Sequence, residues 1–267
     1  MTQGLGGIKF LTKQEFDYQC KSALLHSKTL RFKDKVDKTK RLINDMLNIN
    51  VKKFISLSCG KDSSVMADMI LNIDNTIPTH TALTWESKLI NDNINDVLDY
   101  FKLKGSVNIT YSDFVTGKYK GFNFMDMRSL RKSTHNKRFA FSDCEGVFIG
   151  LRKQESNCRA MALSIFTTDG LPEFCYKYVI DKDEYGKRYL DIRMCPLGYW
   201  QTIDVAAYLV SNNIPVLNWY KYFGFDERTD PNLTPAGMQL GILPKLKIIN
   251  LDGYNKIIER FPELLPK

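Results

Sequence analysis

The sequence predicts an α/β fold: an open, mostly parallel sheet with helices on both faces, extended by a β-hairpin and an irregular C-terminal region. Short apolar runs alternate with amphipathic stretches between residues 53 and 111, as in parallel strands joined by helices. The 267 residues are 43% hydrophobic and 25% charged, which is typical of a soluble globular chain. No apolar run reaches the roughly 18 residues of a membrane-spanning helix, so no membrane partner is expected.

The N-terminal half supplies most of this alternation. Residues 12–49 are expected to be helical because apolar side chains recur every three to four positions. The segments that follow are a strand at 53–57, a helix at 62–71, a strand at 79–84, a helix at 89–103 and a strand at 107–111. Residues 112–143 are aromatic and basic, and we expect a long loop with short helices there.

The C-terminal half continues the pattern and then loses it. The expected elements are a strand at 146–150, a helix at 153–164, a hairpin of strands 174–180 and 188–194, and a helix at 201–212. Gly186 suits the turn of the hairpin. Ile214-Pro215 ends the helix at 201–212. Several prolines then predict an irregular region up to a last helix near 254–260.

The cysteines exclude several kinds of site. They are scattered without any C-x-x-C pair, at Cys20, Cys59, Cys144, Cys158, Cys175 and Cys195. This spacing argues against a disulfide framework, a zinc ribbon and an iron–sulfur cluster. The start of the chain has no long apolar core behind a basic head, so no secretory signal is expected. We therefore predict reduced thiols in a cytoplasmic enzyme.

The net charge of +8 is concentrated in two basic runs, residues 28–41 and 128–138. Most runs of this kind are solvated faces, but they also suit a polyanion. Charge alone does not distinguish a nucleotide substrate from a nucleic-acid substrate.

One segment carries the clearest chemical signal, FISLSCGKDSSVM at residues 54–66. A strand here delivers the chain to the edge of the sheet where open α/β folds bind ligands. Residues 58–60 form a tight turn whose amides can point at an anion, and Gly60 allows a phosphate to come close. The helix from Asp62 offers its positive end, and Lys61 adds a full charge. The hydroxyl donors are Ser56, Ser58, Ser63 and Ser64.

This is not a Walker sequence, because position 55 is Ile55 and the residue after the lysine is Asp62. It resembles the S-G-G-K-D-S loop of the ATP pyrophosphatase superfamily, with Cys59 in place of a glycine. The resemblance implies that the loop grips the pyrophosphate side of a nucleotide and that reaction occurs at the α-phosphate. The alternative is a serine-rich helix cap with an exposed lysine.

A second motif, GLRKQESNCR, follows the apolar run at 147–149. Its spacing is similar to the second signature of the phosphoadenosine-phosphosulfate (PAPS) reductase family, a branch of the same superfamily. The matching residues are Gly150, Arg152, Glu155, Ser156 and Arg159. On a helix the two arginines would share one face, where guanidiniums suit a phosphate or sulfate. The alternative is a surface ion-pair ladder.

A weaker resemblance runs through residues 194–209, which place Trp200 and Tyr208 beside the expected substrate cleft. These two are equally well explained as core aromatics. Residues 85–87 stand where the family has a substrate loop, with a loose match. Together the resemblance covers residues 50–225.

The resemblance has a limit. Reductases of the family use a C-terminal thiol, and some add a four-cysteine iron–sulfur site, but no cysteine follows Cys195 here. Cys59, Cys144 and Cys158 are each expected to be small buried residues rather than nucleophiles. A thiolate therefore has no obvious carrier.

We expect three segments, and the resemblance implies a set of roles. An N-terminal helical segment (1–50) packs on a nucleotide-binding domain (51–225), which an irregular extension (226–267) follows. Lys61, Asp62 and Arg152 are the expected catalytic residues, and Arg159 and the loop amides add positive charge. The expected cofactors are ATP, or PAPS or adenylyl sulfate (APS), with Mg²⁺ held by Asp62, although Asp62 also suits a helix cap.

Three hypotheses remain open. The first is an ATP-using enzyme that adenylylates an acceptor, releases pyrophosphate and so activates the acceptor for sulfur incorporation. The second is a sulfonucleotide reductase that uses an internal or a partner's thiol, and the third is a non-catalytic nucleotide-binding module of a larger complex. The expected partner is an adenine nucleotide. The basic runs are compatible with a nucleic-acid acceptor, and a partner protein or a homo-oligomer also stays open.

Overall fold

The computed structural model describes residues 8, 10–112, 144–165, 170–180, 189–228, 233 and 241–265. Its centre is a six-stranded sheet in the order β3-β2-β1-β4-β6-β5. The strands are β1 (Lys53–Ser56), β2 (Thr79–Thr84), β3 (Val107–Ser112), β4 (Gly146–Phe148), β5 (Cys175–Ile180) and β6 (Tyr189–Met194). Neighbouring strands are parallel except β5 and β6, which pair antiparallel at one edge. The predicted α/β class is therefore confirmed.

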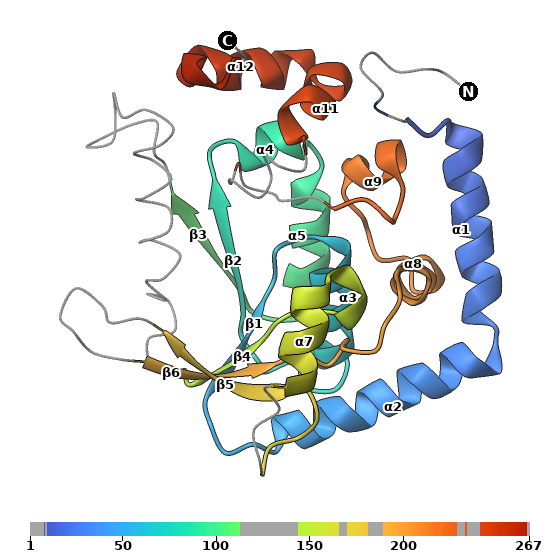
Figure 1. Ribbon diagram of the computed structural model, residues 1–267, viewed down its shortest axis with the longest axis vertical. Coiled ribbons are helices and arrows are strands. Elements are labelled where there is room, and N and C mark those ends of the chain that lie inside the picture. The colour runs from blue at the N-terminus through green and yellow to red at the C-terminus, as the bar shows by residue number, and fades with distance from the viewer. Residues whose placement is uncertain are drawn as a thin grey trace.

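Helices flank this sheet (Figure 1). They are α1 (Lys13–Ser27), α2 (Leu30–Leu47), α3 (Lys61–Leu71), α4 (Ser87–Ile90), α5 (Ile94–Lys102), α7 (Asn157–Ile165), α8 (Thr202–Ser211), α9 (Asn218–Phe223), α11 (Ile242–Ile249) and α12 (Leu251–Arg260), with short 3₁₀ helices η4 (Lys153–Glu155) and η5 (Pro262–Leu264). In Figure 1, α8 lies between α3 and the outer helix α1, and α8 contacts both. Within the described ranges, no helix combines the length and hydropathy needed to span a membrane.

Three predicted helices are divided in the structure. The helix at 12–49 breaks before Thr29, whose hydroxyl oxygen caps the start of α2. The helix at 89–103 becomes α4 and α5, separated by an Asn-Asp-Asn sequence of turn-forming residues. The helix at 153–164 becomes η4 and α7, because Ser156 is extended with φ −169°.

The C-terminal extension is more helical than predicted, and the prediction of irregular structure between residue 226 and a last helix near 254 is wrong for α11. The short helix α9, before this extension, was not among the predicted elements. Pro244 is the third residue of α11, within the first turn, where a missing N–H breaks no intrahelical hydrogen bond. Residues 113–143 and the hairpin turn at 181–188, which includes Gly186, lie outside the described ranges.

A buried carboxylate on α3 connects three helices. Asp68 is 1% exposed, and it accepts hydrogen bonds from the hydroxyls of Tyr100 at 2.7 Å and Tyr208 at 2.9 Å. The ammonium group of Lys104 lies 2.5 Å from the same carboxylate. Because a buried charge is stable only when it is paired and hydrogen-bonded, this network fixes α3 against α5 and α8.

A second buried carboxylate ties the N-terminal helices to the core. Asp204 of α8 accepts hydrogen bonds from Lys35 of α2 at 2.5 Å and is 2.8 Å from His26 Nε2 of α1. The Gln201 amide donates to the same carboxylate at 2.8 Å. Burial opposes the charged form, but these hydrogen bonds outweigh it and lower the pKa of Asp204 below its ordinary value. The carboxylate is therefore ionised at neutral pH and holds α1 and α2 in place.

Asp204→Asn should destabilise the protein at pH 7 by about 3 kcal/mol, because Lys35 and His26 lose a buried charged partner. The folded-state pKa is lowered, so this stabilisation is present above the unfolded-state pKa and is lost as the pH falls through the folded-state pKa. Urea unfolding at pH 7 and in acid measures the difference. Asp252→Asn, which removes an exposed carboxylate paired with Lys256, is the control with little expected effect. An equal loss for Asp204→Asn at both pH values would contradict this account.

Candidate nucleotide site

Serine hydroxyls brace the loop between β1 and α3, residues 57–60. The Ser63 hydroxyl accepts from the Ser58 amide at 3.2 Å, donates to the Gly60 carbonyl oxygen at 3.0 Å and lies 2.9 Å from the Ser58 hydroxyl. These two serines therefore hold the 57–60 loop in shape. The Ser64 hydroxyl is buried and has no hydrogen-bond partner in the described part of the chain. Ser56 is half-buried at the end of β1.

The backbone angles of the loop favour glycine at position 59 but do not require glycine at position 60. Cys59 has φ 58°, a left-handed conformation that favours glycine, and glycine is what the S-G-G-K-D-S pattern places there. Gly60 has φ −72°, which any residue adopts. A Cβ at position 60 would lie 3.4 Å from the Ser58 hydroxyl and 3.5 Å from the Tyr220 hydroxyl, an ordinary contact. Folding alone therefore does not require glycine at position 60.

The second motif packs directly on the start of α3. A Cβ at Gly150 would lie 2.8 Å from the Ser63 amide nitrogen and 2.9 Å from the Asp62 carbonyl carbon. Only glycine allows this approach, because real Cβ atoms do not come that close to backbone. The Lys61 amide donates to the Tyr220 hydroxyl at 3.1 Å. The next two amides, of Asp62 and Ser63, have no acceptor within the helix.

Two buried cations converge on Asp62. Lys61 is 4% exposed and Arg152 is 3% exposed. One oxygen of Asp62 accepts from Arg152 Nε at 2.6 Å, and the other lies 3.5 Å from Lys61 Nζ. Lys61 Nζ also donates to the carbonyl oxygen of Glu227 at 2.9 Å. Burial lowers the pKa of Lys61, and Asp62 opposes this shift.

The prediction that Arg152 and Arg159 share one face of a helix is wrong. Arg152 precedes η4 in an extended conformation, and its side chain turns inward to Asp62 and to the carbonyl oxygen of Trp200 at 3.3 Å. Arg159 lies on α7, is 38% exposed and pairs with Glu155. The ion-pair alternative therefore describes Glu155 and Arg159, while Arg152 is separate and buried. Ser156 is the extended residue that divides the two.

A cavity of about 140 Å³ lies beside the two cations. Its lining residues are Lys61, Arg152, Gln154, Glu155, Thr202, Asp226 and Arg228. The sequence indicated three of these. Gln154, Thr202 and the segment at 226–228 were missed as site residues, as was Tyr220, since no local motif connects α3 with a tyrosine so far along the chain.

The structure also shows where the residues of the weaker resemblance, at 194–209, lie. Trp200 and Tyr208 are both buried, so the alternative that they are core aromatics is correct. Trp200 nevertheless reaches the site through its carbonyl group, which accepts from Arg152. Glu86 of the 85–87 segment is also buried, at the end of β2.

The thiols differ in their surroundings. Burial raises the pKa of Cys59, Cys175 and Cys195 to about 12 in each case, so all three are protonated at neutral pH. Cys59 is buried as predicted, but Cys158 is exposed on α7, and Cys144 is intermediate.

Mg²⁺ fits the described residues poorly as an ion held by the protein alone. Among these residues there is no group of three or more His, Cys, Asp or Glu side chains able to hold a metal. Both oxygens of Asp62 face cations. An ion carried by a polyphosphate needs only one or two carboxylates, so Asp62 as its ligand stays a prediction that requires Asp62 to release Arg152 or Lys61.

Gly60→Ala and Gly150→Ala should separate ligand binding from folding. The alanine at 60 should leave the Tm unchanged but weaken ATP binding about tenfold, because its methyl group occupies the space that a phosphate needs. The alanine at 150 should lower stability by about 1–3 kcal/mol, because its methyl group overlaps the start of α3. Calorimetric titration with ATP and thermal unfolding measure both effects. Unchanged ATP affinity in Gly60→Ala would show that no phosphate approaches this position.

Comparison with known proteins places this sequence in a family. The model of the phosphoadenosine phosphosulfate reductase domain matches residues 52–225. The chain is similar in structure to phosphoadenylyl-sulfate (PAPS) reductase from Candida auris, solved as a phosphate complex, with 12% identity and a TM-score of 0.46 over 84% of this chain and 97% of that chain. NMN synthetase from Francisella tularensis gives 14% identity and a TM-score of 0.45 over 84% and 91%. No curated protein matches the chain. Because the family match covers more than half of the chain, the protein belongs to the phosphoadenosine phosphosulfate reductase domain family, which binds adenine nucleotides.

Proposed function

We propose that this protein binds ATP at the 57–60 loop and the start of α3 and transfers the adenylyl group to an acceptor with release of pyrophosphate. The observation that carries the proposal is the convergence of Lys61 and Arg152 on Asp62, all at the N-terminus of a helix that follows a parallel strand. Helix N-termini and buried cations both favour a phosphate chain. The amides of Asp62 and Ser63, which have no acceptor within the helix, add hydrogen-bond donors.

The proposed reaction exchanges one bond to the α-phosphorus for another. An oxygen of the acceptor attacks this phosphorus, the bond to the bridging oxygen of the β-phosphate breaks, and pyrophosphate leaves with the electron pair. The acceptor's proton passes to solvent. Lys61 and Arg152 neutralise the charge that develops on the leaving group, and Asp62 keeps both cations oriented. The acceptor then carries AMP as a leaving group, which a sulfur nucleophile can displace.

Entry of a nucleotide requires the segment at 226–228 to move. The cavity of about 140 Å³ is smaller than the range of about 300–1,000 Å³ that ligand pockets usually span. Lys61 Nζ also donates a hydrogen bond to the Glu227 carbonyl oxygen. A phosphate oxygen would have to replace this carbonyl oxygen as the acceptor. This segment is held from α11 by Lys245, which pairs with the Glu227 carboxylate at 2.8 Å.

The two other hypotheses have less support. A reductase needs a thiolate, but three of the six cysteines are buried with a raised pKa. The exposed Cys158 is the candidate that a reductase would use. A non-catalytic module predicts ATP binding without turnover.

Purified protein incubated with ATP and Mg²⁺, alone and with DNA or tRNA, should release pyrophosphate. Lys61→Ala and Arg152→Ala should each lower the rate at least tenfold, because each removes a cation from the leaving group. Lys102→Ala, which removes an exposed lysine on α5, is the matched control and should behave like wild type. Detection of labelled pyrophosphate and labelled acceptor measures the reaction.

Three results would decide between the hypotheses. Tight binding of adenylyl sulfate without ATP binding or pyrophosphate release would exclude the proposal. Sulfite release from PAPS or APS that is abolished by Cys158→Ser would favour the reductase. ATP binding that Lys61→Ala weakens, without turnover under any of these conditions, would favour the binding module.

A further inference from the structure

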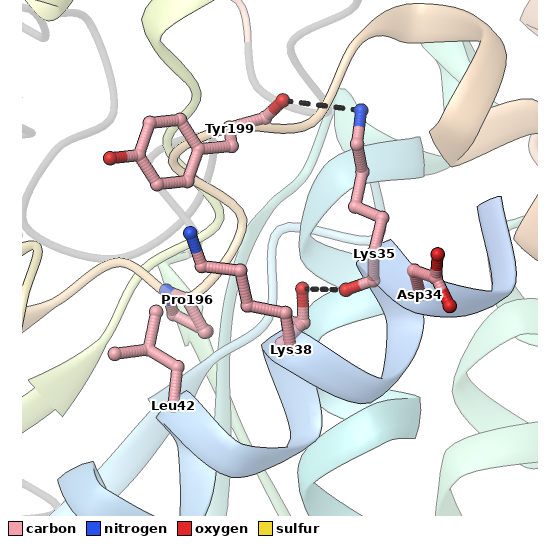
Figure 2. A pocket seen from close by; sticks show the side chains of 7 residues that line it. Asp34, Lys35, Lys38, Leu42, Pro196 and Tyr199 are labelled. Carbon is pink, nitrogen blue, oxygen red and sulfur yellow. Dashed lines mark hydrogen bonds between the residues drawn. The ribbon is translucent and has the colours of Figure 1, made fainter. Parts of the chain in front are cut away.

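A second cavity, of about 300 Å³, lies between α2 and the loop that follows β6 (Figure 2). Its lining residues are Asp34, Lys35, Lys38, Thr39, Leu42, Pro196 and Tyr199. In Figure 2 the Tyr199 ring and the Lys38 ammonium group lie close together over Leu42 and Pro196. The volume is at the lower end of the range for small-molecule pockets, and an apolar floor with a few polar groups is typical of such pockets.

Tyr199 presents a fixed aromatic ring at this cavity. The ring packs edge-on against Phe174 with centroids 4.6 Å apart, and its hydroxyl donates to Glu173. Tyr199 is nevertheless 46% exposed. Lys38 Nζ and Lys153 Nζ lie 4.7 Å and 5.1 Å from its centroid. An exposed ring held in place beside flexible ammonium groups suits a planar, anionic ligand, because the ring stacks and the cations pair.

Cations continue from the cavity along one side of α2. Arg31, Lys38 and Arg41 are exposed and lie within about 80° of one another on the helix, at about 100° per residue. The predicted basic run at 28–41 therefore has a structured counterpart here. Arg31 and Lys38 are about two helical turns apart, and Lys38 and Arg41 are about one turn apart. This elongated arrangement suits a phosphate backbone rather than one isolated phosphate.

Trp200 joins this cavity to the nucleotide site. Its indole N–H donates to the Thr39 hydroxyl at 2.8 Å in the cavity wall, and its carbonyl oxygen accepts from Arg152 at 3.3 Å. Lys153, which lies over the Tyr199 ring, directly follows Arg152. A ligand in the second cavity therefore sits one loop away from the proposed site of adenylyl transfer.

We propose that the second cavity receives one unpaired base of a single-stranded nucleic acid whose backbone follows Arg31, Lys38 and Arg41 along α2. The base stacks on Tyr199 in place of the Lys38 ammonium group, which then meets the adjacent phosphate. This inference deepens the proposed function, on which it rests for the role of the strand as acceptor. Binding of the strand itself does not need ATP.

Fluorescence anisotropy with labelled strands of about 20 nucleotides, longer than a typical single site of about 4–16, tests the proposal without ATP present. Single-stranded DNA, RNA of the same sequence and the DNA duplex are the three probes. At least one single strand should bind more tightly than the duplex, because paired bases cannot enter the cavity. Tyr199→Ala should weaken binding about tenfold, and Lys38→Ala should weaken it and reduce the salt slope by about 0.7.

Matched variants separate the cavity from general charge. Lys40→Ala makes the same change on the same helix, but Lys40 points about 160° away from Lys38. Tyr222→Ala removes a tyrosine of similar exposure, 43%, on α9. Both should bind within about twofold of wild type, and Tyr199→Phe should also bind because it keeps the ring. Thermal unfolding and ATP titration of each variant verify the fold.

Three outcomes would overturn the proposal: no binding of either single strand, equal binding of the duplex, or equal effects of Lys38→Ala and Lys40→Ala. Lys61→Ala distinguishes this failure from that of the proposed function, since it should bind the strand like wild type while losing ATP. Strand binding without ATP turnover would leave the base site standing and exclude adenylyl transfer.

Discussion

The structure around the candidate nucleotide site depends on the burial of two cations, Lys61 and Arg152, around one carboxylate. Buried charges are costly unless they are paired and hydrogen-bonded, and Asp62 supplies that pairing for both. The requirement brings together the end of β1, the segment after β4 and the turn before α8. The rest of the fold holds these segments in register, through Asp68 within the layer of α3 and α8 and through Asp204 at its outer side.

The sheet and most of its helices could be predicted because their signals are local. Alternation of apolar runs located all six strands to within a few residues, and Thr79–Thr84 was predicted at its observed bounds. Boundaries failed where a polar side chain competes with the backbone, as at Thr29 and Ser156. The helix α11 was not predicted because a proline in the first turn of a helix, such as Pro244, cannot be told apart in sequence from a proline that ends a helix.

The site was predictable only in part, for a related reason. The loop motif identified Lys61 and Asp62, and the second motif identified Gly150 and Arg152, but their mutual contacts were not visible. Arg152 turns inward because η4 and an extended Ser156 separate it from the helix of Arg159. Such a break depends on tertiary packing, as do the contacts of Tyr220 and Glu227 with Lys61, which join positions more than a hundred residues apart.

For the proposed binding of ATP, the hydrogen bond from Lys61 to the carbonyl oxygen of Glu227 has a kinetic consequence. An internal hydrogen bond that must break before a phosphate can bind makes the receptive conformation a minor one, and the apparent affinity falls by the fraction of molecules that are open. Association should then become independent of nucleotide concentration at high concentrations, where opening limits the rate. The Lys245–Glu227 ion pair on α11 would set that opening rate, so a contact remote from the phosphates would govern how quickly the protein samples its ligand.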